Sequence, residues 1–399
     1  MSIFVRKSKA IVYLFLITLA IGVPRWSVAQ QSIRIGASMS LTGKYALQGG
    51  YGREGYLLYQ KHVNEKGGVL GRSIEFVIYD DRSDEKTAVR LYEKLIAEDK
   101  VDAVMGPYGS PITDAVADVT EKHLRLMVAP NAATTSLWEK GRRYLVMVLS
   151  PLEALPEGVL DLAARNGLQS LALINDDALV GKAMAKAVIE LAQKKRLQLV
   201  FSETYPKGTV DFSAILNKVK AAKPDVLVAA PAASLVEDAV AITRQMRELD
   251  VNVKMFSSPV YGAHPDYYKR LEKSAEFAYS AGFWEPGLRS PGNQEFVAAY
   301  EKEFNRASGA ASAIAYAGCQ LFVEAARQAG SVDSDKLREA LLKLRTRTLL
   351  GDFAIDERGF QIAHKAITIQ WQDGKQVVVW PDELVSGKPR FPTPPWSQR

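Results

Sequence analysis

The chain has 399 residues, of which 47% are hydrophobic and 24% are charged, and its formal net charge is +6. This length allows two or three domains, and the composition is that of a globular protein, which excludes disordered and low-complexity classes. A single cysteine, Cys319, excludes an intrachain disulfide, and its apolar surroundings predict a buried structural thiol.

Residues 1–29 have the features of a secretory signal. Basic residues at 6–9 precede an apolar run at 10–23, and Ser-Val-Ala at 27–29 is a small-x-small cleavage site. The alternative is an uncleaved membrane anchor, but the apolar run is shorter than the roughly 20 residues that span a membrane. Removal of this segment leaves a net charge of +2. Such a balance lacks the clustered basic stripes of a nucleic-acid-binding protein.

From residue 33 onward, strand-like runs alternate with helical patterns. Such alternation predicts βαβ units, a parallel sheet and helices on both of its faces. The strand-like runs are 33–40, 73–81, 101–107 and 124–130, and the helical patterns between them are 49–65, 84–98 and 110–122.

The pattern pauses at 144–158 and then restarts, which predicts a second doubly wound lobe. Its strand-like runs are 170–176, 197–205, 225–231 and 252–259, and its helical patterns are 181–194, 211–222 and 234–248.

The two predicted lobes share a local repeat. "PYGSPITDAV" (107–116) aligns without gaps to "PAASLVEDAV" (231–240), with five identical positions in ten. Either this is a chance match between helix-rich segments, or both lobes carry the same strand–loop–helix unit. In the second case the two loops would face a common cleft, because open α/β sheets bind ligands beyond the carboxyl ends of their strands.

The last third of the sequence returns to helices before it ends in strands, which predicts that the chain crosses between the lobes more than once. A strand-like run at 276–284 is followed by helical patterns at 293–308, 311–329 and 334–343. Residues 351–381 are rich in strands and turns, and Asp373-Gly374 is a strong hairpin turn. The polar, proline-rich residues 389–399 predict an irregular tail.

No motif predicts catalytic, cofactor-binding or metal-binding residues. "SLTGKYA" (40–46) lacks the spacing and the Ser/Thr of a nucleotide P-loop. The four histidines are scattered, without a partner at metal-ligand spacing, and no Gly-x-Ser-x-Gly elbow occurs.

"MGPYGSPITD" (105–114) is a glycine-rich junction between a predicted strand and a predicted helix. Ser110 stands at the expected N-cap, with Pro111 at the first helical position. Gly109 lets the backbone approach a ligand, and the free amides at the helix start favour an anion. The loop carries no basic residue, so a carboxylate suits it better than a phosphate. The alternative is that Ser110 only caps its own helix.

"APNAATTSLW" (129–138) is a second loop of small residues after a strand. Asn131 and Thr134 would offer amide and hydroxyl groups to the same ligand, although an ordinary turn fits the sequence equally well.

These motifs, taken in this order, resemble the leucine/isoleucine/valine-binding protein family. Its members are type I periplasmic binding proteins of ATP-driven importers. The likeness runs from about residue 33 to residue 381. The segments that carry it are 40–49, 64–84, 106–110, 129–134 and 205–228.

The resemblance implies an α/β fold of two doubly wound, Rossmann-like lobes joined by three crossover strands near residues 150, 282 and 349. It also implies that no cofactor is needed and that the protein is a monomer. The expected division is a signal peptide at 1–29, an N-terminal lobe at 30–150 plus 283–348, a C-terminal lobe at 151–282 plus 349–388, and a tail at 389–399.

The resemblance also implies a ligand site between the lobes. In members that bind amino acids, the loop that matches Tyr108, Gly109 and Ser110 holds the ligand carboxylate. The loop that matches 131–134 supplies carbonyls and a hydroxyl, and Gln48 falls where an aromatic ring often packs on the ligand. The expected ligand-binding residues are Tyr45, Gln48, Tyr108, Gly109, Ser110, Asn131, Ala132, Ala133, Thr134, Val180 and Tyr261.

The second lobe departs from the family pattern. Val180 replaces the usual tyrosine before Gly181, and Pro259 stands near the position of the glutamate that receives the ligand ammonium. A buried ammonium without a carboxylate partner is costly, and only Asp176 or Asp177 offers a substitute. A small carboxylic acid or amide, including an aromatic one, therefore fits at least as well as an α-amino acid.

The implied function is capture of a small ligand by hinge closure and its delivery to a membrane permease, in the periplasm and without a chemical step. The alternatives are a ligand-sensing receptor of the same fold and a periplasmic enzyme.

Overall fold

The computed structural model describes residues 1, 31–231, 236–259 and 261–399. Backbone contacts separate Met1–Gln31 from one compact unit, Ser32–Arg399, and the description below concerns that unit. The predicted signal segment lies outside the described residues except for Met1. No helix among the described residues is both long and apolar enough to cross a membrane.

The first sheet has five parallel strands in the order β2-β1-β3-β4-β5. Four of them, β1, β3, β4 and β5, are almost wholly buried, as expected when helices cover both faces of a parallel sheet. The strands are β1 (Ile33–Met39), β2 (Ile74–Asp80), β3 (Ala103–Met105), β4 (Met127–Ala129) and β5 (Leu145–Met147), and the connecting helices are α1 (Ala46–Glu65), α2 (Glu85–Ala97) and α3 (Ser110–Lys122).

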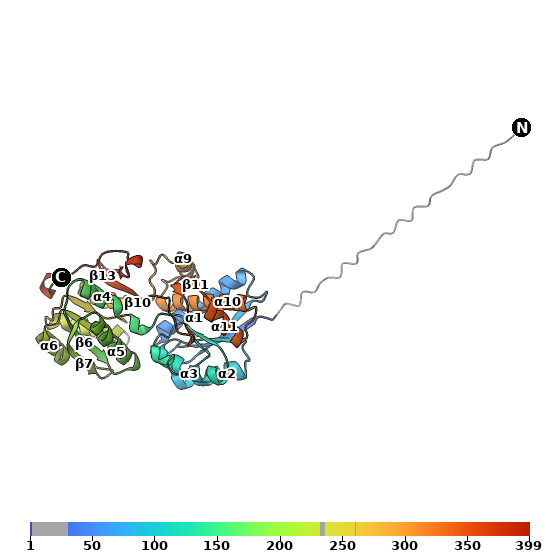
Figure 1. Cartoon of the computed structure of the whole chain (residues 1–399), viewed down its shortest axis with the longest axis horizontal. Coiled ribbons are helices and arrows are strands. Elements are labelled where there is room, and N and C mark those ends of the chain that lie inside the picture. The colour runs from blue at the N-terminus through green and yellow to red at the C-terminus, as the bar shows by residue number, and fades with distance from the viewer. Residues whose placement is uncertain (2–30, 232–235, 260) are drawn as a thin grey trace. The chain divides into compact units, whose positions relative to one another are not determined.

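The second sheet has seven strands in the order β14-β13-β10-β9-β8-β6-β7. Five are parallel, and β13 and β14 add an antiparallel hairpin at one edge. The strands are β6 (Ser170–Asp176), β7 (Gln198–Tyr205), β8 (Val226–Ala230), β9 (Met255–Ser257), β10 (Tyr279–Gly282), β13 (Ile367–Gln372) and β14 (Lys375–Trp380). The helices of this part of the chain are α4 (Glu157–Arg165), α5 (Leu179–Lys194), α6 (Ser213–Ala222), α7 (Val236–Glu248) and α8 (Pro265–Leu271). Figure 1 shows α4, α5 and α6 around the sheet. The predicted turn at Asp373-Gly374 joins β13 to β14.

The five parallel strands of both sheets follow the same order, with the second strand of each lobe first, then the first, third, fourth and fifth. The segments that carry the local repeat, β3–α3 and β8–α7, therefore occupy the same place in their sheets. Residues 232–235 of the second copy lie outside the described residues. This equivalence supports a shared strand–loop–helix unit rather than a chance match.

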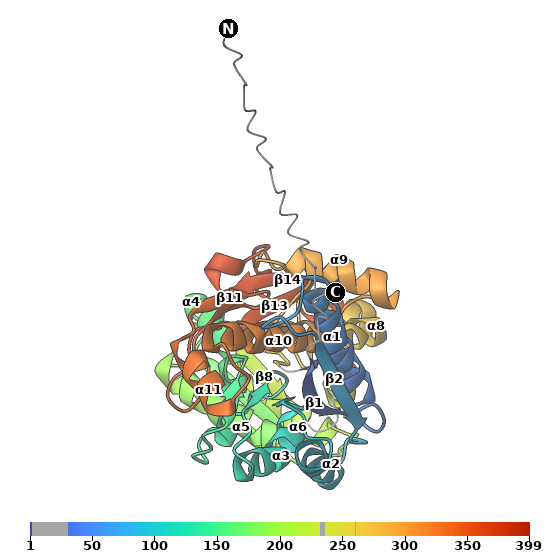
Figure 2. The same ribbon diagram turned by 90° about the vertical axis from the view of Figure 1, so that its right-hand side faces the viewer.

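Three late helices follow β10 in the chain, and they pack beside elements of the first sheet. They are α9 (Asn293–Phe304), α10 (Ala310–Ala329) and α11 (Ser334–Lys343). Figure 2 shows α10 beside α1, where a Cβ on Gly55 would overlap the carbonyl oxygen of Ser312. Cys319 on α10 is 2% exposed, and burial raises the pKa of its thiol, so the predicted buried thiol is confirmed.

The chain passes between the lobes three times, and the three segments meet at one histidine. Nδ1 of His364, in the third passage, accepts hydrogen bonds from the backbone N–H and the hydroxyl of Ser150 in the first, at 2.9 and 3.0 Å. The ring of Phe283, in the second, lies 6.1 Å from the imidazole ring. A short hairpin, β11 (Thr346–Thr348) and β12 (Gly351–Phe353), precedes His364. The residue boundaries of the lobes stay a prediction.

The sequence patterns missed β5, α4, α8 and β11. The first two lie in the segment where the pattern pauses, with Pro151 and Pro156 between them, and the last two are too short to show a period. Residues 389–399 hold one short 3₁₀ turn and are otherwise irregular. The Trp396 indole donates to the Val251 carbonyl at 2.8 Å, so this segment packs on the second lobe.

Candidate functional site

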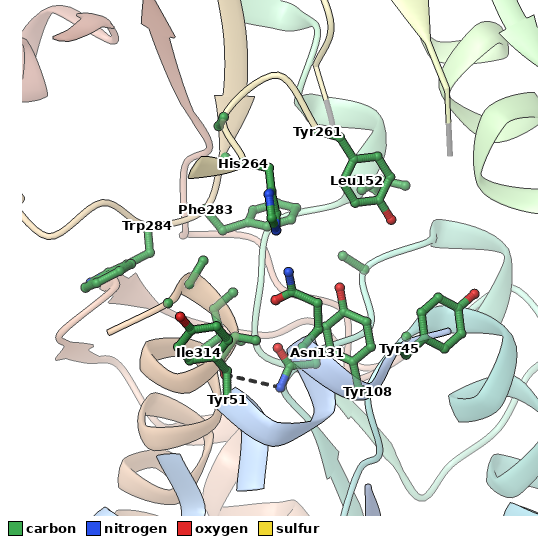
Figure 3. A pocket seen from close by; sticks show the side chains of 18 of the residues that line it. Tyr45, Tyr51, Tyr108, Asn131, Leu152, Tyr261, His264, Phe283, Trp284 and Ile314 are labelled. Atoms are coloured by element: carbon green, nitrogen blue, oxygen red, sulfur yellow. Dashed lines mark hydrogen bonds between the residues drawn. The ribbon is translucent and has the colours of Figure 1, made fainter. Parts of the chain in front are cut away.

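A cleft of about 1190 Å³ lies beyond the carboxyl ends of the parallel strands. Loops and helix starts from both lobes line it, together with residues of the second passage between them (Figure 3). Nine of the eleven predicted ligand-binding residues line this cleft: Tyr45, Gln48, Tyr108, Gly109, Ser110, Asn131, Ala133, Val180 and Tyr261. Ala132 and Thr134 do not, since both are buried at 1% and 0% exposure.

The start of α3 differs from its prediction. Gly109, not Ser110, is the N-cap, with φ +90°, and its carbonyl accepts the first intrahelical bond from the Thr113 N–H at 3.0 Å. Ser110 is then the first helical residue, and its backbone N–H belongs to the groups that no intrahelical bond can satisfy. A left-handed φ of this size explains the glycine, because other residues adopt it only with strain.

The Ser110 hydroxyl serves the neighbouring loop rather than its own helix. Its Oγ accepts from the backbone N–H groups of Ala133 and Thr134, at 3.3 and 3.4 Å, and from the Thr134 hydroxyl at 3.0 Å. Gly109 N–H donates to the Asn131 carbonyl at 3.0 Å. These hydrogen bonds connect the two predicted loops, and the buried Thr134 supports Ser110 from the side away from the cleft. The idea that Ser110 only caps its helix is wrong.

Asn131 and Gln48 bring amide groups to the same wall. The Asn131 Nδ2 donates to the Ala311 carbonyl at 3.5 Å at the start of α10, which ties the loop after β4 to a helix from far along the chain. Gln48 lies in the first turn of α1, and Tyr51, which sequence analysis missed, follows it by three residues and lines the cleft as well. Because residues three apart lie on the same face of a helix, the position of Gln48 could have predicted that Tyr51 also faces the cleft.

The loop before α1 is held by the carboxylate of Asp80 at the end of β2. Asp80 Oδ1 accepts from the backbone N–H groups of Leu41, Thr42 and Arg82, at 2.9, 3.2 and 2.8 Å. Burial alone would raise the pKa of Asp80, but these bonds lower it below its usual value. The segment that superficially resembled a P-loop is therefore an ordered loop that positions Tyr45.

Aromatic rings dominate the interior of the cleft. Figure 3 shows Tyr45 and Tyr108 on one wall, with Tyr261 and Phe283 facing them. The Tyr45 and Tyr108 rings lie 5.7 Å apart at an interplanar angle of 58°. Burial raises the pKa of Tyr108 and of Tyr261, so both phenols stay neutral. Trp284 lines the cleft too, with its indole N–H bonded to Asn293 Oδ1 at 2.6 Å.

The cleft is lined by three lysines and three carboxylate side chains. They are Lys44, Glu85, Lys207, Asp266, Glu285 and Lys375. Burial raises the pKa of Glu285, in the second passage. Neither Asp176 nor Asp177 lines the cleft. Asp177 instead accepts the backbone N–H of Lys207 at 2.9 Å.

His264 is the main polar residue that sequence analysis missed. It lines the cleft from the second lobe, and its Nδ1 accepts the backbone N–H of Asp266 at 3.2 Å at the start of α8. Burial lowers the pKa of His264, against the opposing charges of Asp266 and Glu237. The nearby Tyr261 in the same short loop was the available signal. Among the described residues, no group of three or more His, Cys, Asp or Glu side chains is arranged to hold a metal ion.

Comparisons with known proteins show the family and the fold. The family described as "Periplasmic binding protein" matches residues 32–376. A Leu/Ile/Val-binding protein homolog 7 of Brucella suis is 25% identical over 91% of this chain and 95% of its own. The branched-chain amino acid binding protein LivJ of Streptococcus pneumoniae, solved with isoleucine, has a TM-score of 0.77 at 23% identity and covers 88% of this chain and 100% of its own. A solute-binding protein from R. palustris, solved with 4-hydroxybenzoate, has a TM-score of 0.75 at 23% identity over 87% and 95%. The two structural likenesses show the fold.

Proposed function

Because the chain belongs to the periplasmic binding protein family, we propose that it is the substrate-binding component of an ATP-driven importer. It captures a small ligand with a carboxylate in the cleft and presents it to a membrane permease. We further propose that it acts as a monomer in the periplasm, after removal of residues 1–29, and that it carries out no chemical step on the ligand.

The observation that carries this proposal is the polar wall formed by Gly109, Ser110 and Ala133. The Ser110 N–H lies in the first turn of α3 and has no acceptor within the helix, so it can donate to a ligand. The Ser110 hydroxyl accepts hydrogen bonds from the next loop and still has its own proton to donate. Backbone and hydroxyl donors at a helix start suit a carboxylate, because they match its acceptors and lie at the positive end of the helix dipole.

Closure follows from a cleft lined by both lobes. A ligand held by Ser110 reaches residues of the second lobe, such as Val180 and Tyr261, in the closed arrangement. It then binds that arrangement more tightly than an open one and shifts the population toward it. The permease would recognise the closed form. The proposed lobes are 30–150 plus 283–348 and 151–282 plus 349–388.

The experiment is a binding assay that also measures turnover. The purified protein is examined by native mass spectrometry for a retained ligand, and then by calorimetry with leucine, benzoate and 4-hydroxybenzoate. Binding of a carboxylate without chemical change supports the proposal. Formation of a product from any bound compound, or absence of both retained ligand and binding, would overturn it.

A further inference from the structure

The second wall of the cleft faces the end of the ligand opposite its proposed carboxylate, and its side chains decide which chemical group is recognised there. Among the described lining residues contributed by the second lobe, Asp266 is the single carboxylate, and its side chain is 45% exposed. Lys207 and Lys375 lie on the same wall. An ammonium group buried against this wall would lack a desolvated anionic partner, which is costly.

His264 is a polar side chain that the second wall directs into the cleft, beside Tyr261. Figure 3 shows its ring projecting from that wall toward the side of Tyr108 and Asn131. The side chain is 16% exposed. Its Nε2 makes no hydrogen bond to any residue that the structure describes.

The protonation state of this ring follows from its contact with α8. A nitrogen that accepts a hydrogen bond carries no proton, and Nδ1 accepts the Asp266 N–H. The neutral ring therefore carries its proton on Nε2, which makes Nε2 a donor. The acidic groups near the ring are Asp266, whose Oδ2 lies 3.9 Å from Nδ1, and Glu237, and burial outweighs both in setting the neutral form.

The loop that carries His264 is fixed from two further strands. The Trp371 indole on β13 donates to the Gly262 carbonyl at 2.6 Å, and the Gln376 side chain on β14 donates to the Ala263 carbonyl at 2.6 Å. The His264 N–H itself donates to the Tyr261 carbonyl at 3.0 Å. The ring is thus held before a ligand arrives, as a specificity residue needs to be.

We propose that His264 selects the ligand, and that the ligand is an aromatic carboxylate with an oxygen at the end opposite its carboxylate. This inference rests on the proposed function, since it assumes that the carboxylate lies at Ser110. The aromatic rings of Tyr45, Tyr108 and Phe283 pack the body of the ligand. The Nε2–H of His264 donates to the far oxygen.

A ligand and protein cycle tests the contact. Benzoate and 4-hydroxybenzoate differ by the far oxygen alone, and calorimetry gives the ratio of their affinities. We expect the unaltered protein to favour 4-hydroxybenzoate about tenfold, the size of one well-placed hydrogen bond. His264→Asn and His264→Leu are expected to reduce the ratio to about one. Asparagine retains an acceptor for the Asp266 N–H whereas leucine does not, so a loss of thermal stability is expected in the leucine variant only.

The outcomes separate this inference from the proposed function. Equal binding of the two benzoates by the unaltered protein, a ratio that persists in His264→Asn, or tighter binding of leucine than of 4-hydroxybenzoate would overturn the role of His264 and leave a carboxylate-binding protein. Failure of all three compounds to bind would overturn the ligand class, and a retained ligand seen by mass spectrometry would still support the proposed function.

A second measurement needs no ligand. Nitrogen-15 NMR of the histidine rings distinguishes the two neutral tautomers. We expect the proton of His264 on Nε2 in the free protein, and a downfield shift of that proton when 4-hydroxybenzoate binds but not when benzoate binds. A proton on Nδ1 would contradict the proposal.

Discussion

The two walls of the cleft are built in different ways. Beside the rings of Tyr45 and Tyr108, the first presents backbone groups and a small hydroxyl, with Gly109, Ser110 and Ala133 connected by hydrogen bonds between two loops. The second uses the side chains of Tyr261 and His264, which project from a loop fixed by strands at the far edge of its sheet. A backbone wall recognises a group that many ligands share, whereas a side-chain wall discriminates among them. The predictions below test this division.

The largest effect is expected at Gly109. A valine there is strained at φ +90° and adds a side chain to the wall at which we propose that the carboxylate binds. We expect affinity for every carboxylate ligand to fall by about 1000-fold, or about 4 kcal/mol, in calorimetry. Gly141→Val is the matched control, because Gly141 has φ +75° and open surroundings but does not line the cleft. Equal losses in both variants would mean that strain alone is responsible.

The stability of the protein should depend on pH through His364, where the three passages between the lobes meet. Burial lowers the pKa of His364 to about 4, from 6.5 in a model peptide. Between these pH values the unfolded chain binds the proton more readily than the folded chain. The free energy of unfolding is therefore highest above about pH 6.5 with respect to this group, and it decreases by about 3 kcal/mol as the pH falls toward 4. Urea unfolding from about pH 7 to about pH 4.5 measures this loss. His364→Gln cannot take up the proton and should show a shallower dependence; an unchanged slope would contradict the prediction.

Removal of the Ser110 hydroxyl should weaken the first wall without blocking it. Ser110→Ala leaves the Ala133 and Thr134 N–H groups without their acceptor, so we expect about 30-fold weaker binding of carboxylates, or about 2 kcal/mol, and a lower melting temperature. Ser170 accepts the Asp225 N–H at 2.8 Å away from the cleft, so Ser170→Ala should lower stability alone. Unaltered affinity in Ser110→Ala would mean that the ligand carboxylate does not bind at this wall.

The smallest effect is expected from the support of the second wall. Trp371→Phe removes the bond to the Gly262 carbonyl and should loosen the loop of His264, which weakens binding of 4-hydroxybenzoate about fivefold, or about 1 kcal/mol. Trp396→Phe removes a similar indole bond, to the Val251 carbonyl at 2.8 Å, and should not change affinity. If benzoate loses as much affinity as 4-hydroxybenzoate, the loop supports the whole cleft rather than the far end of the ligand.

Local patterns predicted most of the fold because its elements are strongly periodic. The helices at 110–122 and 334–343 begin and end where the sequence indicated. The elements that were missed are short, such as the three-residue β5, or begin directly after a proline, such as α4 after Pro156. Such elements leave little trace in a window of ten residues.

The candidate site was only partly predictable for a related reason. The first wall uses glycine, proline and serine at a strand end, and those residues have local conformational meanings that a sequence shows directly. The acceptor role of the Ser110 hydroxyl depends on a loop 23 residues later, which no local pattern reveals. His264 depends on the contact with α8 and on strands about 100 residues away. Lone histidines carry no periodic signal.

The common strand order of the two sheets makes the protein modular. The central strands of each sheet are buried, and connections that follow the strands carry residues of the cleft. Replacement of the 258–264 connection by one of another chemistry should leave the hydrophobic framework intact. The second lobe is therefore the place to redesign the molecule as a receptor for other acids, with the first lobe retained as a fixed grip.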